Sequence, residues 1–299
     1  MEPLHRFRGC LLGLATGDAV GTTVEFRPRG SFPPVTDMVG GGPFGLNPGQ
    51  WTDDTSMALC LATSLLSQNS FDAVDQMNRY CDWYDHGYLS STGECFDIGN
   101  ATSRSLRQYR QFGNPFSGSS HSRSAGNGCL MRLAPVPMFF YPDRDRTIHF
   151  SGESSRTTHG AVECIDASRL FGDILHRALS GASKDEILWQ SDPDIVDSPS
   201  IKAIATGIYR EKPIDEIEST GYVVHSLEAA LWCFWTTDSY KNAVLKATNL
   251  GDDADTTAAI CGQVAGAFYG QPGIPSHWLE QLTMVEEITT LADQLYAAT

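Results

Sequence analysis

The 299-residue sequence predicts an all-α fold, and two observations support this prediction. Apolar residues recur every three or four positions along most of the chain, and glycine, proline or asparagine separates these stretches. No segment shows a convincing alternation of apolar and polar residues, which a half-buried strand requires. We therefore expect helices at residues 3–21, 53–68, 71–86, 97–112, 160–180, 224–235, 238–249 and 254–269.

Small residues form a stripe along the first and the last of these helices. Residues four positions apart lie on one face of a helix. Glycine lowers helix stability by about 1 kcal/mol relative to alanine, so its repeated use predicts a close approach between two backbones. We expect both helices to lie deep in the molecule, where they could touch. The stripes are Gly9, Gly13, Gly17 and Gly21, and Ala254, Ala258, Gly262, Gly266 and Gly270.

Three longer connections separate the helices. Residues 27–51 contain several glycines and prolines, residues 113–128 are rich in glycine, serine and asparagine, and residues 191–200 are acidic and broken by proline. The last of these is typical of a solvent-facing linkage. Connections longer than about 12 residues are often functional. None of them requires a domain boundary, so we expect residues 1–299 to form a single domain.

Charge and composition exclude several classes of protein. The net charge is −15, from 36 acidic and 21 basic residues, and no basic cluster offsets it, so nucleic acid and anionic membrane are poor partners. The eight cysteines include no Cys-x-x-Cys pair, which suits reduced, buried thiols. No stretch reaches the roughly 18 apolar residues of a membrane span. The apolar run at 10–16 is too short and glycine-rich for a secretion signal, so we expect a cytoplasmic protein.

Two acidic strings stand at the predicted starts of two helices. A helix N-terminus favours one acidic or hydroxyl side chain but does not need three. Clustered carboxylates repel one another unless a cation or a proton neutralises them, so the strings indicate bound metal. Their oxygen ligands suit Mg²⁺, Mn²⁺ or Ca²⁺. The strings are Thr52-Asp53-Asp54-Thr55 and Asp252-Asp253-Ala254-Asp255-Thr256.

Ordinary helix capping is the alternative interpretation of both strings. Thr52 could be the N-cap of the helix at 53–68, with the following acids facing the helix dipole. The second string weakens this alternative because it contains three acids in four residues. An EF-hand is excluded, because the required glycine and distal glutamate are absent. If both strings converge, they favour a site for two ions.

A set of motifs in fixed order identifies the family that this chain resembles. The resemblance is to the ADP-ribosylglycohydrolase family, which includes the dinitrogenase reductase-activating glycohydrolase and hydrolases of ADP-ribosylarginine and ADP-ribosylserine. It covers nearly the whole chain. The motifs are Gly13-Leu14-Ala15-Thr16-Gly17-Asp18-Ala19 with Glu25, Thr52 to Thr55, Phe96-Asp97-Ile98-Gly99, Gly126-Asn127-Gly128 with Met131-Arg132, Thr158-His159, Gly221-Tyr222, and Gly251 to Thr256.

The resemblance implies an all-α fold with a binuclear Mg²⁺ or Mn²⁺ centre in a cleft. Such a centre would hold the vicinal ribose hydroxyls of ADP-ribose, position C1″ and activate water. Relatives commonly carry glycine where this chain has Asp252, and the extra acid could change metal affinity or choice. By matching positions, the metal ligands would be Thr52, Asp53, Asp54, Asp253, Asp255 and Thr256.

Two further acids are candidates for catalysis. Glu25 ends the first helix, where a carboxylate opposes the dipole; it is either a solvated loop acid or, by the resemblance, the acid that approaches the scissile bond. Asp97 lies between Phe96 and Ile98, an apolar setting that would raise its pKa and suit acid–base work. The alternative for Asp97 is the N-cap of the following helix.

Four residues are candidates for substrate binding. Asn127 and Gly128 offer unobstructed backbone N–H groups that could hold a pyrophosphate. The resemblance places His159 in the ligand cleft, against the alternative of a helix-start histidine, whereas Tyr222 could contact adenine or the distal ribose, or pack in the core. His225 stays unassigned.

The sequence therefore predicts a metal-dependent hydrolase that releases ADP-ribose from modified arginine, on a protein or on a small conjugate. Because the net charge repels free ADP-ribose, local cations such as Arg132 are expected to assist its binding. The alternatives are a hydrolase of ADP-ribosylserine or another conjugate, and a catalytically silent ADP-ribose-binding module. We expect a monomer.

Overall fold

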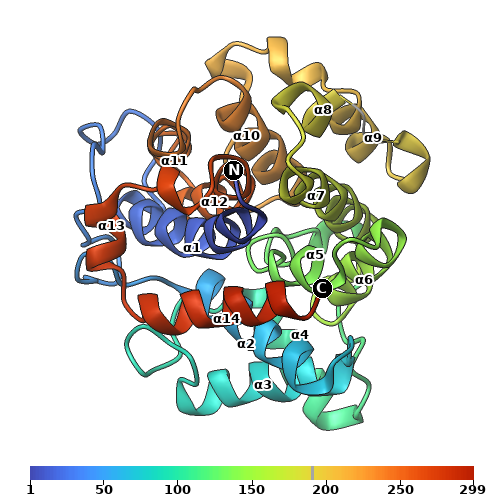
Figure 1. Cartoon of the computed structure of the whole chain (residues 1–299). Helices are drawn as coiled ribbons and strands as arrows, with labels where there is room; N and C mark the ends of the chain where they lie inside the picture. Colours follow the sequence, from blue (N-terminus) through green and yellow to red (C-terminus); the bar gives the residue numbers. More distant parts are fainter. Residues whose placement is uncertain (190–191) are drawn as a thin grey trace.

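The computed structural model describes residues 1–189 and 192–299, and it confirms the all-α prediction (Figure 1). Within these residues, extended pairing is limited to isolated bridges, such as those between Ser119 and His159 and between Gly126 and Tyr222. None of the helices in the described part of the chain could cross a membrane, because none is both long and apolar enough.

The helices in chain order are as follows. The α-helices are α1 (Pro3–Gly21), α2 (Asp53–Gln68), α3 (Ala73–His86), α4 (Asn100–Phe112), α5 (Pro135–Phe140), α6 (Arg144–Arg156), α7 (Val162–Ser180), α8 (Lys184–Trp189), α9 (Pro199–Ala205), α10 (Val223–Trp235), α11 (Tyr240–Thr248), α12 (Ala254–Tyr269), α13 (Ser276–Gln281) and α14 (Val285–Ala297). Short 3₁₀ helices are η1 (Thr22–Val24), η2 (Ser122–Ser124), η3 (Pro193–Ile195), η4 (Ile208–Glu211), η5 (Ile214–Glu216) and η6 (Gln271–Gly273).

All eight expected helices are present, and three of them have the expected bounds, namely α1, α2 and α12. The helix expected at 97–112 begins at Asn100 instead, because Asp97 has φ 59°, in the left-handed region, and Gly99 is the N-cap. Capping therefore does not explain Asp97. Of the connection at 191–200, Ser191 lies outside the described residues, and the remainder contains η3 and the start of α9.

Several helices have no strong signal in the sequence. The short α5 has prolines at its first and third positions, where the missing backbone N–H groups would be unpaired in any case. The C-terminal α14 buries only a narrow face, formed by Ile288, Ala292 and Leu295. Neither helix was predicted, nor were α6, α8, α9 and α13.

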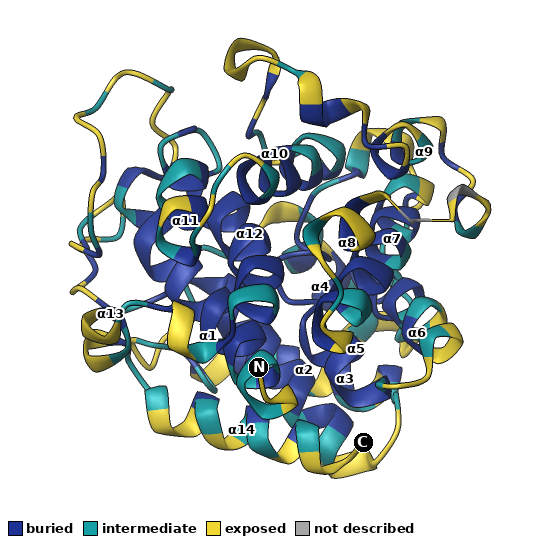
Figure 2. Cartoon of the chain, turned by 45° about the horizontal axis from the view of Figure 1, so that its top comes forward, coloured by how far each residue is buried: buried dark blue, intermediate teal, exposed yellow. Residues whose placement is uncertain are grey.

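The centre of the molecule is the antiparallel contact between α1 and α12, drawn in blue and orange-red in Figure 1. A methyl group on Gly13 would overlap the carbonyl oxygen of Gly262, and one on Gly9 would overlap that of Gly266. The predicted close approach of the two glycine stripes is therefore confirmed. Both helices are buried along almost their whole length (Figure 2).

This register determines which residues meet at the end of the contact. The last turn of α1, at Gly21, lies against the backbone of Asp255 in the first turn of α12. Asp18, one turn earlier on α1, is completely buried beside it. The glycine stripes thus bring a carboxylate of α1 to the start of the second acidic string.

The structure yields a direct prediction for the helix contact. Gly13→Ala should reduce the free energy of unfolding by about 1–3 kcal/mol or more, because the added methyl group meets backbone that cannot move aside. Urea denaturation at equilibrium measures this change. Gly99→Ala is the control: a methyl group there meets no atom, and φ is −67°, so the loss should stay within about 1 kcal/mol. Equal stability of Gly13→Ala and the wild type would contradict the account.

Candidate active site

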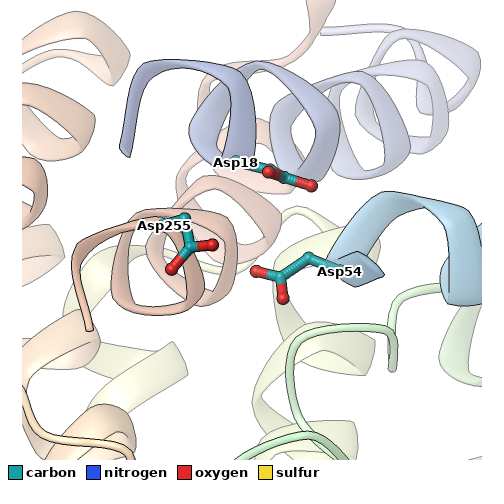
Figure 3. A group of neighbouring side chains, drawn as sticks. All are labelled: Asp18, Asp54 and Asp255. Carbon is teal, nitrogen blue, oxygen red and sulfur yellow. The ribbon is translucent and has the colours of Figure 1, made fainter. Parts of the chain in front are cut away.

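Three chain segments bring their carboxylates together at one place. Figure 3 shows Asp18 from α1, Asp54 from α2 and Asp255 from α12 pointing toward one space. One oxygen of each lies within 4.8 Å of the others. Asp255 belongs to a second group of the same size, with Glu25 and Asp97. The structure therefore brings both acidic strings to adjacent acid clusters that share Asp255.

Asp18 organises the start of α2. Its Oδ1 accepts hydrogen bonds from the backbone N–H of Thr52 at 2.9 Å and from the Thr52 hydroxyl at 3.0 Å. Its Oδ2 accepts from the N–H of Thr55 at 3.0 Å and from the Thr55 hydroxyl at 2.6 Å. These four bonds use the lone pairs that a carboxylate offers, so Asp18 positions the string rather than adding a free ligand.

The capping interpretation does not account for either string. Thr52 is the N-cap of α2 and Asp253 is the N-cap of α12, and neither side chain makes a capping hydrogen bond. Instead, the Thr256 hydroxyl donates to Asp54 at 3.2 Å, which links the two strings directly.

Burial of the acids is severe, and the protein does not neutralise them. Burial raises the pKa of Glu25 to about 9, with the charge of Asp97 adding to the effect. Burial likewise raises the pKa of Asp97 to about 7. For Asp53, Asp54 and Asp255, burial and then the neighbouring carboxylates raise the pKa well above its usual range. In the described part of the chain, no lysine or arginine forms a salt bridge with any of these acids.

The acid clusters fit divalent cations. Asp54 Oδ2 and Glu25 Oε2 are buried and have no hydrogen-bond partner among the described residues. A buried carboxylate oxygen without a partner is costly unless a cation or a proton satisfies it. The surrounding donors are carboxylate and hydroxyl oxygens, which hard cations such as Mg²⁺ and Mn²⁺ prefer.

A cavity of about 1190 Å³ opens beside the clusters. Of the twelve residues predicted to bind metal, bind substrate or take part in catalysis, Thr52 and Asp54 do not line it, whereas the other ten do. Those ten are Glu25, Asp53, Asp97, Asn127, Gly128, His159, Tyr222, Asp253, Asp255 and Thr256.

Loop residues 122–128 form part of the cavity wall, and two backbone hydrogen bonds hold them in place. The N–H of Asn127 donates to the carbonyl of Gly221 at 3.1 Å, and the N–H of Val223 donates to that of Ala125 at 3.0 Å. The Asn127 side chain also donates to Asp253 at 2.8 Å, so the loop is connected directly to the second acidic string.

Tyr222 is fixed at the start of α10. Its hydroxyl donates to Glu163 at 2.7 Å, and its ring contacts that of His225 edge-on, with centroids 4.9 Å apart. Because Tyr222 is only partly buried and lines the cavity, one part of its ring remains available to a ligand.

His159 is held by a chain of two hydrogen bonds. Arg132 Nη2 donates to the Thr158 hydroxyl at 2.6 Å, and that hydroxyl lies 2.8 Å from His159 Nδ1. Arginine cannot accept, so the Thr158 proton is directed to Nδ1, which leaves the imidazole proton on Nε2. Burial, followed by the charge of Arg132, lowers the pKa of His159 to about 3. The neutral ring packs against Gly128, where a Cβ atom would lie 2.8 Å from it.

Arg132 itself is not a ligand-binding cation, so that expectation is wrong. It is fully buried and does not line the cavity, because its guanidinium lies over the ring of Tyr80 and bonds to Thr158. The cations of the cavity wall are Arg104 and Arg123 instead. Neither was singled out from the sequence, although Arg123 lies in the loop at 113–128.

Two other features of the site, the role of Asp18 and the backbone conformation of Asp252, were also not predicted. Asp18 could have been noticed as the one acid in the otherwise apolar and glycine-rich second half of α1. Asp252 has φ 55°, a left-handed conformation that glycine adopts freely and aspartate tolerates. That conformation explains why glycine suits this position, and Asp252 is in neither acid cluster.

Comparisons with known proteins agree with this geometry. The family model described as ADP-ribosylglycohydrolase matches residues 1–299. The chain is 46% identical, over 99% of its length and 80% of the relative's, to the ADP-ribosylarginine hydrolase Tri1 of Serratia proteamaculans (strain 568). It is 32% identical, over 98% of its length and 96% of the relative's, to the ADP-ribosyl-[dinitrogen reductase] glycohydrolase of Rhodospirillum rubrum.

A solved structure is similar throughout. It is described as an ADP-ribosylglycohydrolase-related protein complex and superposes with a TM-score of 0.89 at 42% identity, covering 99% of both chains. Together with the full-length family match, these similarities show that the chain belongs to the ADP-ribosylglycohydrolase family.

Proposed function

We propose that the protein is a metal-dependent hydrolase that releases ADP-ribose from ADP-ribosylated arginine side chains. The observation that carries the proposal is the pair of acid clusters that share Asp255 at one end of a cavity of about 1190 Å³. The 46% identity to an ADP-ribosylarginine hydrolase supports arginine as the modified residue. We expect the enzyme to act as a cytoplasmic monomer.

Two divalent cations, Mg²⁺ or Mn²⁺, would be held by Thr52, Asp53, Asp54, Asp253, Asp255 and Thr256. When bound, they would supply Lewis acidity for the ribose hydroxyls and for water. Thr52 suits this role because its hydroxyl donates its proton to a carboxylate, with Asp18 at 3.0 Å and Asp255 at 3.3 Å as acceptors, which leaves oxygen lone pairs available.

Glu25 and Asp97 would move the protons of the reaction. Their raised pKa values, about 9 and about 7, let the pair hold one proton near neutral pH, so one carboxyl is an acid and the other a base. The ionised group takes a proton from the water that attacks C1″. As the C1″–N bond breaks, its electron pair leaves with the guanidine, and the protonated group donates to that nitrogen.

The opposite part of the cavity would bind the rest of ADP-ribose. Gly128 would offer its backbone N–H and His159 its Nε2–H to the pyrophosphate, while Arg104 and Arg123 supply positive charge. The backbone N–H of Asn127, also expected to bind the pyrophosphate, donates to the carbonyl of Gly221 instead, so Asn127 would act through its side-chain bond to Asp253. Tyr222 would contact adenine or the distal ribose. A neutral His159 keeps its donor proton throughout the physiological pH range, since its pKa is about 3.

The reaction can be tested with two modified peptides. We expect Mg²⁺ or Mn²⁺ to support release of ADP-ribose from a peptide ADP-ribosylated on arginine, and we expect EDTA to abolish it reversibly. A peptide ADP-ribosylated on serine is the comparison substrate, and chromatography of released ADP-ribose is the measurement. Turnover of the serine peptide alone would support the O-linked alternative. Turnover of neither peptide, with tight ADP-ribose binding, would show a silent binding module.

Substitution separates proton transfer from metal binding. Asp97→Asn should reduce kcat about 10²- to 10⁴-fold, because the side chain can no longer carry a proton, and it should retain Mn²⁺ binding in calorimetry. Asp255→Asn should lose both activity and Mn²⁺ binding, because Asp255 is a proposed metal ligand that lies close to Asp54 as well as to Glu25 and Asp97. Glu94→Gln, an exposed acid three residues before Asp97, is the matched control and should behave as wild type. Full activity of Asp97→Asn would remove it from the mechanism.

A further inference from the structure

Three phenylalanines gather near the two acids proposed for proton transfer. Phe26 directly follows Glu25 in the chain, and Phe96 directly precedes Asp97. The rings of Phe26 and Phe44 have centroids 6.5 Å apart, and those of Phe44 and Phe96 are 5.3 Å apart. Phe26 lines the cavity and is 65% exposed. We refer to Phe26, Phe44 and Phe96 as the aromatic collar.

The backbone holds Phe26 in an unusual position. Its φ is 61°, in the left-handed region, where a bulky residue is rarely found. Its N–H donates to the carbonyl of Asp252 at 2.7 Å, and the N–H of Asp252 donates to the carbonyl of Arg27 at 2.8 Å. Such strain persists only where the surroundings enforce it, and it is concentrated at functional sites. Here it holds a large apolar ring in solvent at the edge of the cavity.

The collar also lacks a cation from its own chain. Elsewhere the protein covers aromatic faces with its own side chains: Arg132 lies 4.8 Å from the ring of Tyr80, and Lys246 lies 3.9 Å from that of Trp232. Among the described residues, no arginine or lysine lies over a collar ring. Arg27, although adjacent to Phe26, lies over Phe32.

We propose that the aromatic collar is the leaving-group subsite, which holds the guanidinium and methylene chain of the modified arginine. This inference rests on the proposed function. A planar guanidinium stacks on aromatic faces and is attracted to the ionised member of the Glu25 and Asp97 pair, while its methylenes pack on apolar rings. A serine side chain has neither group. The collar therefore favours arginine conjugates through binding of the part of the substrate that ADP-ribose lacks.

The proposal predicts a specific kinetic change. Phe26→Ala should raise KM for the arginine peptide about tenfold, because a partly desolvated cation–π contact is lost, while kcat changes less than about twofold. Phe44 and Phe96 do not line the cavity and support Phe26 from behind, so Phe96→Ala should raise KM in the same direction but less than Phe26→Ala does. Phe26→Trp should retain the wild-type KM, and Phe26→Leu, which keeps apolar bulk without a π face, should fall between alanine and tryptophan.

Binding of ADP-ribose separates recognition from misfolding. Its dissociation constant, measured by calorimetry with Mn²⁺, should be the same in Phe26→Ala and the wild type, since ADP-ribose carries no guanidine. Phe112→Ala is the matched control: Phe112 is 71% exposed at the end of α4 and does not line the cavity, so its KM should not change.

Two results would overturn the inference. One is an unchanged KM in both Phe26→Ala and Phe96→Ala, and the other is an equal loss of affinity for ADP-ribose and for the arginine peptide, which would indicate structural damage. Failure of the proposed function is a separate outcome, because the wild type itself would then release no ADP-ribose from the arginine peptide.

Discussion

The close packing of α1 against α12 is the constraint on which the rest of the site depends. Glycine pairs such as Gly13 and Gly262 let the two backbones approach until no side chain fits between them. This register sets Asp18 beside Asp255, and Asp18 then binds Thr52 and orients the start of α2. The glycine stripes carry no reactive side chains, but their packing thus determines where the two acidic strings meet.

The same packing removes water from the acids, and this creates the electrostatic character of the site. Buried carboxylates without basic partners favour either protons or cations. Asp54 shows this most clearly, because one of its oxygens is buried and has no partner in the described part of the chain. Beside the cavity, burial raises the pKa of Glu25 to about 9 and that of Asp97 to about 7, and the charges of neighbouring acids add to the effect. Both values lie in a range useful for proton transfer.

Features carried by a repeated local pattern could be predicted from the sequence. The bounds of α1, α2 and α12 follow from long apolar periodicity, and both acidic strings stand out because the acids are adjacent in the chain. The motifs of the family also identified residues that line the cavity. In contrast, the short α5 and the narrow face of α14 leave little periodicity to detect.

What could not be predicted depends on contacts between distant segments. The sequence shows that Arg132 is positively charged, but its partners, Tyr80 and Thr158, lie on other elements. The burial of Arg132 therefore could not be predicted. The left-handed backbone of Asp97 likewise has no local signal, because aspartate also suits an N-cap. The aromatic collar assembles from three separate parts of the chain.

The most direct test of the account is anomalous diffraction from crystals of the full chain grown with Mn²⁺. The account predicts two manganese peaks between the string that begins at Thr52 and the string that ends at Thr256, with Asp255 in contact with them. An absence of manganese between these strings, at a concentration that supports turnover, would contradict it.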